Sequence, residues 1–134
     1  MPDAQTIASR FIDALNDRDF DALSRLLDED VALDSLTGQR TVGAVPLRAW
    51  VMNYLRHFDE SFGDIVLMRD AFGQRVAADT TARGTYRETM AGLPEASGQS
   101  YSIPSVFVFE IEDGVITRLS HYRNLRLFER ELTG

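Results

Sequence analysis

The amino-acid sequence predicts one soluble α+β domain, and two observations lead to that fold class. Apolar residues recur at helical spacing in the first part of the chain, up to about residue 58. From about residue 64 the pattern changes to alternating stretches separated by turn residues, which is typical of antiparallel strands. Helices that precede a group of strands indicate a domain in which the helices pack on one face of a sheet.

Length and composition agree with this class and exclude several kinds of function. The 134 residues suit a single domain over residues 1–134. There is no cysteine, which excludes disulfides, thiol nucleophiles and thiolate metal sites. All 14 basic residues are arginine, which excludes a lysine Schiff base, and the net charge of −7 disfavours nucleic acid as a partner. We find no signal peptide and no membrane-spanning apolar run, so we expect a cytoplasmic location.

Three amphipathic helices are expected at the N-terminal end. The first covers about Ala4–Asn16 with Asp3 as its N-cap, and a short second helix begins after the cap Asp19. The third has the clearest period, because its apolar residues fall at i, i+3, i+4, i+7, i+8 and i+11. The apolar faces are Phe20, Leu23, Leu26 and Leu27 in the second helix, and Leu47, Trp50, Val51, Tyr54, Leu55 and Phe58 in the third.

The remaining elements are expected to be strands. Their predicted ranges are Val31–Asp34, Asp64–Ala71, Arg75–Glu88, Tyr101–Glu112 and Val115–Arg123. A loop over Thr89–Gln99 precedes the fourth strand, and Asp113-Gly114 is a strong hairpin turn before the fifth. The apolar residues Leu125, Phe128 and Leu132 predict a short terminal helix or a docked tail.

Several short segments, in this order, resemble one superfamily. The segments are Phe11–Asn16, Asp19–Leu23, Leu26–Val31, Gly43, Gly84–Tyr86, Gly92–Pro94, Gly98, Phe107–Ile116 and His121–Leu125. Together they resemble SnoaL-like proteins (polyketide cyclases) and ketosteroid isomerase-related proteins of the nuclear transport factor 2-like superfamily, over nearly the whole chain. The resemblance implies a cystatin-like fold, in which a curved mixed or antiparallel sheet is wrapped by the N-terminal helices to form a conical pocket. It also implies a homodimer through the convex face of the sheet.

The resemblance implies only part of the catalytic set of the true ketosteroid isomerases. Those enzymes use an aspartate base, and they place a tyrosine and a protonated aspartic acid at the oxyanion. The tyrosine position here is Phe11 and the late acid position is Ser105. The base position is Ser35 in a gapless match and Asp34 after a shift of one residue, and such a shift reverses the face of a strand.

His121 is the leading candidate for acid/base chemistry, with Asp34 as its partner or as an alternative base. His121 is one of only two histidines, and imidazole titrates near neutral pH. The gapless match puts Leu119, His121 and Arg123 on the face that lines the cavity; the alternative is an outward-facing histidine. A carboxylate in an apolar pocket has a raised pKa and can act as a base. The alternative for Asp34 is an ordinary aspartate that begins a turn.

The other candidate pocket residues are mainly apolar or carry a hydroxyl group. They are Phe11, Leu15, Ser35, Trp50, Tyr54, Tyr101, Ser105, Phe107, Phe109, Leu119 and Arg123. We expect Tyr101 and Ser105 to polarise a carbonyl oxygen, while simple core packing is the alternative for the apolar members. Asp79 and Arg83 alternate on one strand face and form either a substrate-orienting pair or an outer salt bridge. Two distant histidines make no metal site, so no metal or cofactor is expected.

Three functions follow from these observations. The first is a cofactor-free isomerase or cyclase that acts on a small hydrophobic carbonyl compound. The second is a non-catalytic module that binds a hydrophobic ligand. The third is a dimeric protein-interaction domain, which would have a largely filled cavity and an exposed apolar patch.

Overall fold

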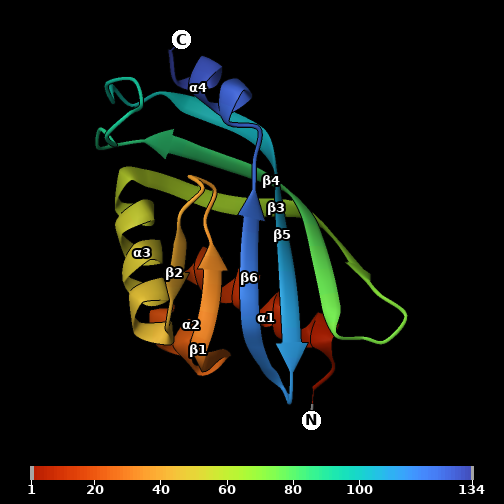
Figure 1. Ribbon diagram of the computed structural model, residues 1–134. Coiled ribbons are helices and arrows are strands. Elements are labelled where there is room, and N and C mark those ends of the chain that lie inside the picture. Colours follow the sequence, from red (N-terminus) through yellow and green to blue (C-terminus); the bar gives the residue numbers. More distant parts are fainter. Residues whose placement is uncertain (1, 134) are drawn as a thin grey trace.

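The structure, a computed structural model that describes residues 2–133, is a curved sheet packed against helices (Figure 1). Its elements are α1 (Ala4–Asp17), α2 (Phe20–Arg25), β1 (Leu27–Asp34), β2 (Arg40–Val42), α3 (Ala44–His57), β3 (Phe58–Arg69), β4 (Arg75–Tyr86), β5 (Ser100–Glu112), β6 (Val115–Tyr122) and α4 (Leu125–Thr133). Helices precede most of the sheet in the chain, as predicted.

The sheet is mixed. Its six strands are ordered β2-β1-β6-β5-β4-β3. Strands β1 and β6 are parallel, and all other neighbours are antiparallel. Helix α1 crosses one face of the sheet and α3 flanks it, whereas α4 lies at the end where the chain leaves β6 (Figure 1). The predicted α+β class with a curved mixed sheet is therefore confirmed.

Local signals placed the helix starts correctly but misplaced two boundaries between helix and strand. The side chains of Asp3 and Asp19 cap α1 and α2 by accepting hydrogen bonds from backbone amides, as predicted. Leu27 was predicted to be helical but begins β1, where it pairs with Ile116 of β6. Phe58 was predicted to end α3 but begins β3. Both errors arise because a short apolar run has the same appearance in a buried helix and in a buried strand.

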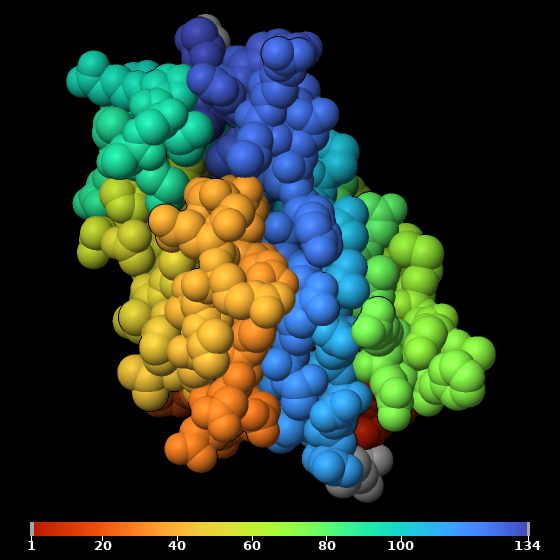
Figure 2. Space-filling view, in the orientation of Figure 1, coloured from red at the N-terminus to blue at the C-terminus, as the bar shows by residue number. Residues whose placement is uncertain are grey.

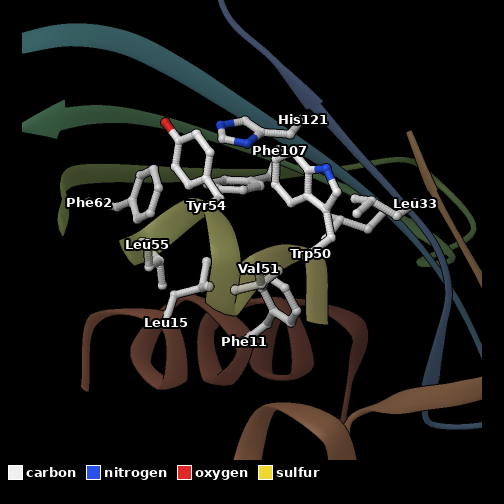
Figure 3. A pocket seen from close by; sticks show the side chains of 11 residues that line it. Phe11, Leu15, Leu33, Trp50, Val51, Tyr54, Leu55, Phe62, Phe107 and His121 are labelled. Atoms are coloured by element: carbon white, nitrogen blue, oxygen red, sulfur yellow. The ribbon is translucent and has the colours of Figure 1, made fainter. Parts of the chain in front are cut away.

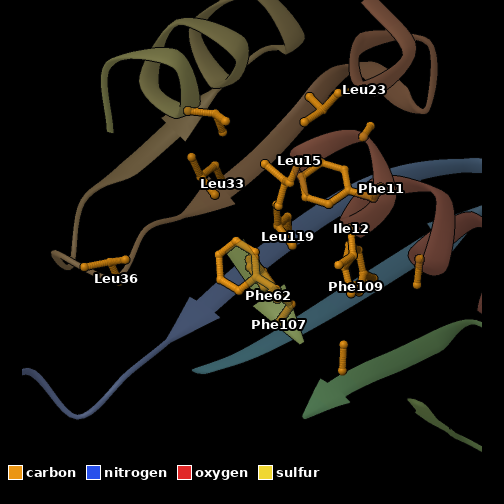
Figure 4. Close-up of a cluster of buried hydrophobic side chains, with 14 of the residues drawn as sticks. Phe11, Ile12, Leu15, Leu23, Leu33, Leu36, Phe62, Phe107, Phe109 and Leu119 are labelled. Atoms are coloured by element: carbon orange, nitrogen blue, oxygen red, sulfur yellow. The ribbon is translucent and has the colours of Figure 1, made fainter. Parts of the chain in front are cut away.

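The core lies between α1 and the concave face of the sheet. The ring of Phe11 meets Phe109 edge to face, with centroids 5.5 Å apart. Figure 4 shows side chains of α1, β1, β5 and β6 converging on this region. Along β5 the residues from Tyr101 to Ile111 are alternately buried and more exposed. This alternation determines which side chains of β5 can reach a cavity, because successive residues of a strand point to opposite faces.

Candidate functional site

A small apolar cavity lies between α1, α3 and the concave face of the sheet (Figure 3). Its volume is about 30 Å³, room for about two water molecules at roughly 10–15 Å³ each. The residues that line it are Phe11, Leu15, Leu33, Trp50, Val51, Tyr54, Leu55, Phe62, Phe107, Leu119 and His121. Side chains of α1 lie at one end of the cavity and His121 lies at the other (Figure 3).

The register of β5 and β6 holds the imidazole of His121 at this cavity. His121 pairs with Phe107 across the two strands, and their rings stack with centroids 4.2 Å apart. The ring atom Nε2 lies 2.6 Å from Oγ of Ser105, which is two residues from Phe107 on the same face of β5. Burial, and secondarily the charge of Arg123, lower the pKa of His121 well below the ordinary value. The imidazole is therefore neutral at pH 7.

Behind His121 lies a buried ion pair between Arg123 and Glu60. Nη2 of Arg123 donates to Oε2 of Glu60 at 2.9 Å, and Nη1 donates to Oε1 at 3.0 Å. Both side chains are fully shielded from solvent. The guanidinium carbon lies 4.7 Å from the ring centroid of Phe128, so α4 covers one face of the arginine. Such a bidentate pair fixes the position of both groups.

Two tyrosines complete the shell around the carboxylate. The hydroxyls of Tyr54 and Tyr101 donate to Oε1 of Glu60, at 3.0 Å and 2.5 Å. Burial and the neighbouring carboxylate raise the pKa of each phenol, so both remain protonated donors. Burial opposes the charge of Arg123, but the tyrosines and Glu60 hold its pKa above the ordinary value. At neutral pH the network therefore contains one cation, one anion and two neutral hydroxyls.

The hydrogen bonds of Ser105 determine which nitrogen of His121 carries the proton. Nη2 of Arg123 donates to Oγ of Ser105 at 3.0 Å, which uses one acceptor site of that oxygen. The other partner of this buried oxygen within residues 2–133 is Nε2 of His121, at 2.6 Å. Since a guanidinium cannot accept, the hydroxyl proton has Nε2 as its acceptor. A neutral imidazole that accepts at Nε2 carries its proton on Nδ1. No hydrogen-bond partner of Nδ1 is found within residues 2–133, and His121 lines the cavity. His121 thus brings a neutral imidazole to a wall that otherwise consists of apolar and aromatic side chains.

The structure places Asp34 and Ser35 outside the cavity, and this corrects their expected placement. Asp34 accepts from Nε and Nη2 of Arg40 at 2.7 and 2.9 Å and lies 3.3 Å from Arg118. Its hydrogen bond with Arg40 holds the pKa of the carboxyl below its ordinary value. Ser35 is buried in the turn, where its Oγ contacts Oγ1 of Thr37 at 3.0 Å. The residue of β1 that lines the cavity is Leu33, since adjacent strand residues face opposite sides.

The other predicted pocket residues divide into two groups. Those on the cavity wall are Phe11, Leu15, Trp50, Tyr54, Phe107, Leu119 and His121. Tyr101, Ser105 and Arg123 lie behind that wall in the polar network. Phe109 packs against α1 in the core. The expectation that the hydroxyls of Tyr101 and Ser105 reach a ligand directly is therefore corrected: they bind Glu60 and His121.

Asp79 and Arg83, which were predicted to share one strand face, lie on the outer face of β4. Arg83 is exposed and pairs with Asp64 at 2.7 Å, not with Asp79. The buried residues of β4 alternate with Asp79 and Arg83, so these two side chains face away from the cavity and do not orient a substrate there. At the end of α3, Nδ1 of His57 donates to the carbonyl oxygen of Glu88 at 2.9 Å. His57 does not line the cavity.

Sequence reasoning missed Glu60, which lies at the centre of the network. The helical period of α3 had been extended to Phe58, and the next strand was predicted to begin at Asp64. In the structure Phe58, Glu60 and Phe62 are buried on one face of β3. The signal was the alternation of two phenylalanines around a glutamate. It becomes informative only when the strand is known to begin at Phe58.

Residues 2–133 contain no group of three or more histidine, cysteine, aspartate or glutamate side chains arranged to hold a metal ion. None of the helices in this part of the chain is long and apolar enough to cross a membrane.

Comparison with known proteins supports both fold and family. A family model described as the SnoaL-like domain matches residues 8–119. A candidate polyketide cyclase from Pseudomonas putida KT2440 is 34% identical, with a TM-score of 0.94, 98% of this chain covered and 99% of the other. A candidate polyketide cyclase from Xanthomonas campestris pv. campestris is 33% identical, with a TM-score of 0.91 and 96% of each chain covered.

The fold is also shared with a more distant solved structure. An epoxide hydrolase of the LEH-like type from M. tuberculosis is 19% identical, with a TM-score of 0.77, 97% of this chain covered and 84% of the other. At that identity the likeness shows the fold alone. No curated protein matches the sequence.

Proposed function

Because this chain belongs to the family of SnoaL-like domains, we propose that it is a cofactor-free enzyme of the isomerase or cyclase type. Its substrate is a small hydrophobic carbonyl compound that enters the cavity beneath α3. The imidazole of His121 carries the proposal, because it is the one histidine in a wall that otherwise consists of apolar and aromatic side chains. In this proposal its Nδ1–H group is the donor that meets the ligand. Ligand sites of this kind combine many apolar contacts with a few oriented polar groups.

The chemical role of His121 follows from its protonation state. A neutral imidazole donates from Nδ1 to a carbonyl oxygen and stabilises the negative charge that develops there when a neighbouring C–H bond gives up its proton to a water molecule. In an apolar site this stabilisation is stronger than in water. Ser105 is a positioning residue: its hydroxyl holds Nε2 and thereby keeps the proton on the side of the ligand. Arg123 orients Ser105 in turn.

Trp50 is the residue that must move to admit a ligand. The cavity of about 30 Å³ is far smaller than typical ligand sites of roughly 300–1,000 Å³. Tyr54 is fixed by Glu60 and Arg123, whereas the half-buried Trp50 has no hydrogen bond to residues 2–133 and stacks on Tyr54 at 5.3 Å. We therefore propose that the indole of Trp50 swings outward on binding. As the only tryptophan of the chain, it reports binding through its fluorescence.

Deuterium exchange tests the proposed chemistry without knowledge of the natural substrate. Cyclic ketones, among them cyclohexanone and 2-methylcyclohexane-1,3-dione, are incubated in D₂O with the protein, and exchange next to the carbonyl is followed by NMR. We expect the protein to accelerate exchange, and His121→Phe to lower the acceleration by about 10²–10⁴-fold. Phenylalanine retains the stacking on Phe107 but has no donor.

His57→Gln is the matched control, because it removes the other histidine at a position outside the cavity. It should exchange like the wild type. Binding without acceleration of exchange, for every ketone that changes Trp50 fluorescence, would exclude the enzyme and leave the ligand-binding module.

A dimeric protein-interaction domain is the second candidate, and two observations favour it. The cavity is nearly filled, and no helix covers the face of the sheet that points toward the viewer in Figures 1 and 2. On this face β3 exposes Val66 and Met68, and β6 exposes Tyr122. We propose a homodimer through this face. Val66→Lys should give a monomer in light scattering if the proposal is correct; an unchanged mass would reject it.

A further inference from the structure

A second, larger cleft lies beside the small cavity, at the end of the sheet where α4 packs. Its volume is about 270 Å³. The turn after β1, the loop between β4 and β5, and α4 surround it with apolar side chains, among them Leu36, Met90, Leu93 and Phe128. Its floor is formed by Tyr54 and Phe58. The one charged residue in its lining, Glu129, is acidic, so the cleft disfavours an anion.

Tyr54 lines both the cavity and the cleft. Its ring lies in a continuous aromatic stack, 5.3 Å from Trp50 of the cavity and 4.9 Å from Phe58 of the cleft. The leucines of β1 and of the turn after it are also distributed over the two compartments. Leu33 lines the cavity, and Leu36 lines the cleft. The two compartments are therefore neighbours that share the wall formed by Tyr54.

The volumes of the cavity and the cleft indicate what kind of ligand could occupy both. The cavity of about 30 Å³ has room for little more than the carbonyl group of a compound that contacts His121. The rest of the molecule needs adjacent apolar volume, and the cleft provides about 270 Å³ of it. Typical ligand sites hold roughly 300–1,000 Å³, so the two together approach that size.

We propose that the cleft is the subsite for the apolar tail or second ring of the ligand. This inference rests on the proposed function, because it takes the carbonyl group at His121 as its starting point. The ligand is a neutral carbonyl compound with an extended apolar body. Its body passes between Tyr54 and the end of β1, and the loop that carries Met90 and Leu93 closes over it.

A homologous series of ketones tests the subsite. Cyclohexanone and its 4-methyl, 4-propyl and 4-pentyl derivatives share one carbonyl group and differ only in tail length. Dissociation constants are measured by NMR titration. Each methylene that enters the cleft should tighten binding by about fourfold, which is the value expected for its removal from water. Leu93→Asp and Met90→Asp should abolish this gain per methylene.

Val45→Asp is the matched control, since it makes the same change at a side chain that is 80% exposed and lies outside both compartments. It should keep the gain. If cyclohexanone binds and the tails add nothing, the subsite is rejected while the proposed function stands. A gain that persists in both loop variants also rejects it, because the tail then lies elsewhere. If no ketone of the series binds, the subsite and the proposed function are both rejected.

Discussion

Replacement of Glu60 by glutamine should destabilise the protein strongly, although the two side chains have nearly the same shape. The carboxylate accepts four hydrogen bonds, two from Arg123 and one each from Tyr54 and Tyr101. In the variant an amide NH₂ occupies one oxygen position, where it cannot accept from these donors. It also leaves the charge of Arg123 buried without a counterion. Breaking a buried pair in this way costs about 3–5 kcal/mol.

This loss corresponds to a large shift in the melting temperature. Unfolding entropy is about 2.1 cal/mol/K per residue, so a chain of 134 residues loses roughly 10–18 °C in Tm for this change. Thermal unfolding at pH 7, followed by circular dichroism, measures it.

Asp64→Asn is the matched control for Glu60→Gln. It makes the same chemical change in the exposed pair of Asp64 with Arg83, whose atoms lie 2.7 Å apart. Exposed pairs contribute little, so its Tm should stay near the wild-type value. Asp64 has a φ of 50°, which asparagine tolerates. Equal Tm values for the two variants would refute the view that the buried pair organises the interior.

Three further outcomes are expected. Gly84→Ala should lower the free energy of unfolding by about 1–3 kcal/mol, because the added Cβ would lie 2.5 Å from the hydroxyl of Tyr101. Gly63→Ala should lower it less, because its Cβ meets only the flexible end of an arginine side chain, at 3.2 Å. Urea unfolding of both variants tests this difference. Below about pH 6.5 the free energy of unfolding of the wild type should fall more steeply with decreasing pH than that of His121→Phe, by up to ~1.4 kcal/mol per pH unit. The reason is that His121 binds a proton in the unfolded chain but stays neutral when it is buried in the folded protein. Parallel stability curves from pH 7 to 5 would contradict this. Asp34→Asn should leave the rate of deuterium exchange unchanged, since the carboxylate of Asp34 pairs with arginines outside the cavity. A loss of rate comparable to that of His121→Phe would instead identify Asp34 as a base.

Most of the fold could be predicted because its signals are local. The cap Asp3, the helical period of α3 and the hairpin turn Asp113-Gly114 each depend on residues close in sequence. The missed elements depend on distant partners. Strand β2 spans only Arg40–Val42 and exists because β1 pairs with it. Leu27 belongs to a strand because β6 lies beside it.

The candidate site was predicted unevenly for the same reason. Periodicity alone places Phe11, Trp50 and Tyr54 on inward helix faces, and alternation places Phe107 on the inner face of its strand. These predictions need only the period of one element. The position of Asp34 depended on the phase of a strand, and a phase that differs by one residue points the side chain to the opposite face.

The sequence by itself determined the class of the fold, the absence of thiol and lysine chemistry, and the small set of side chains that can move a proton. Only the tertiary structure decided how those side chains combine. Glu60 and Arg123 are 63 residues apart in the chain, yet they form one buried pair. Through Ser105 that pair places the proton of His121 on Nδ1. A hydrogen-bond network of this kind follows from the contact of distant strands, and the pattern within any one strand contains no information about its partner.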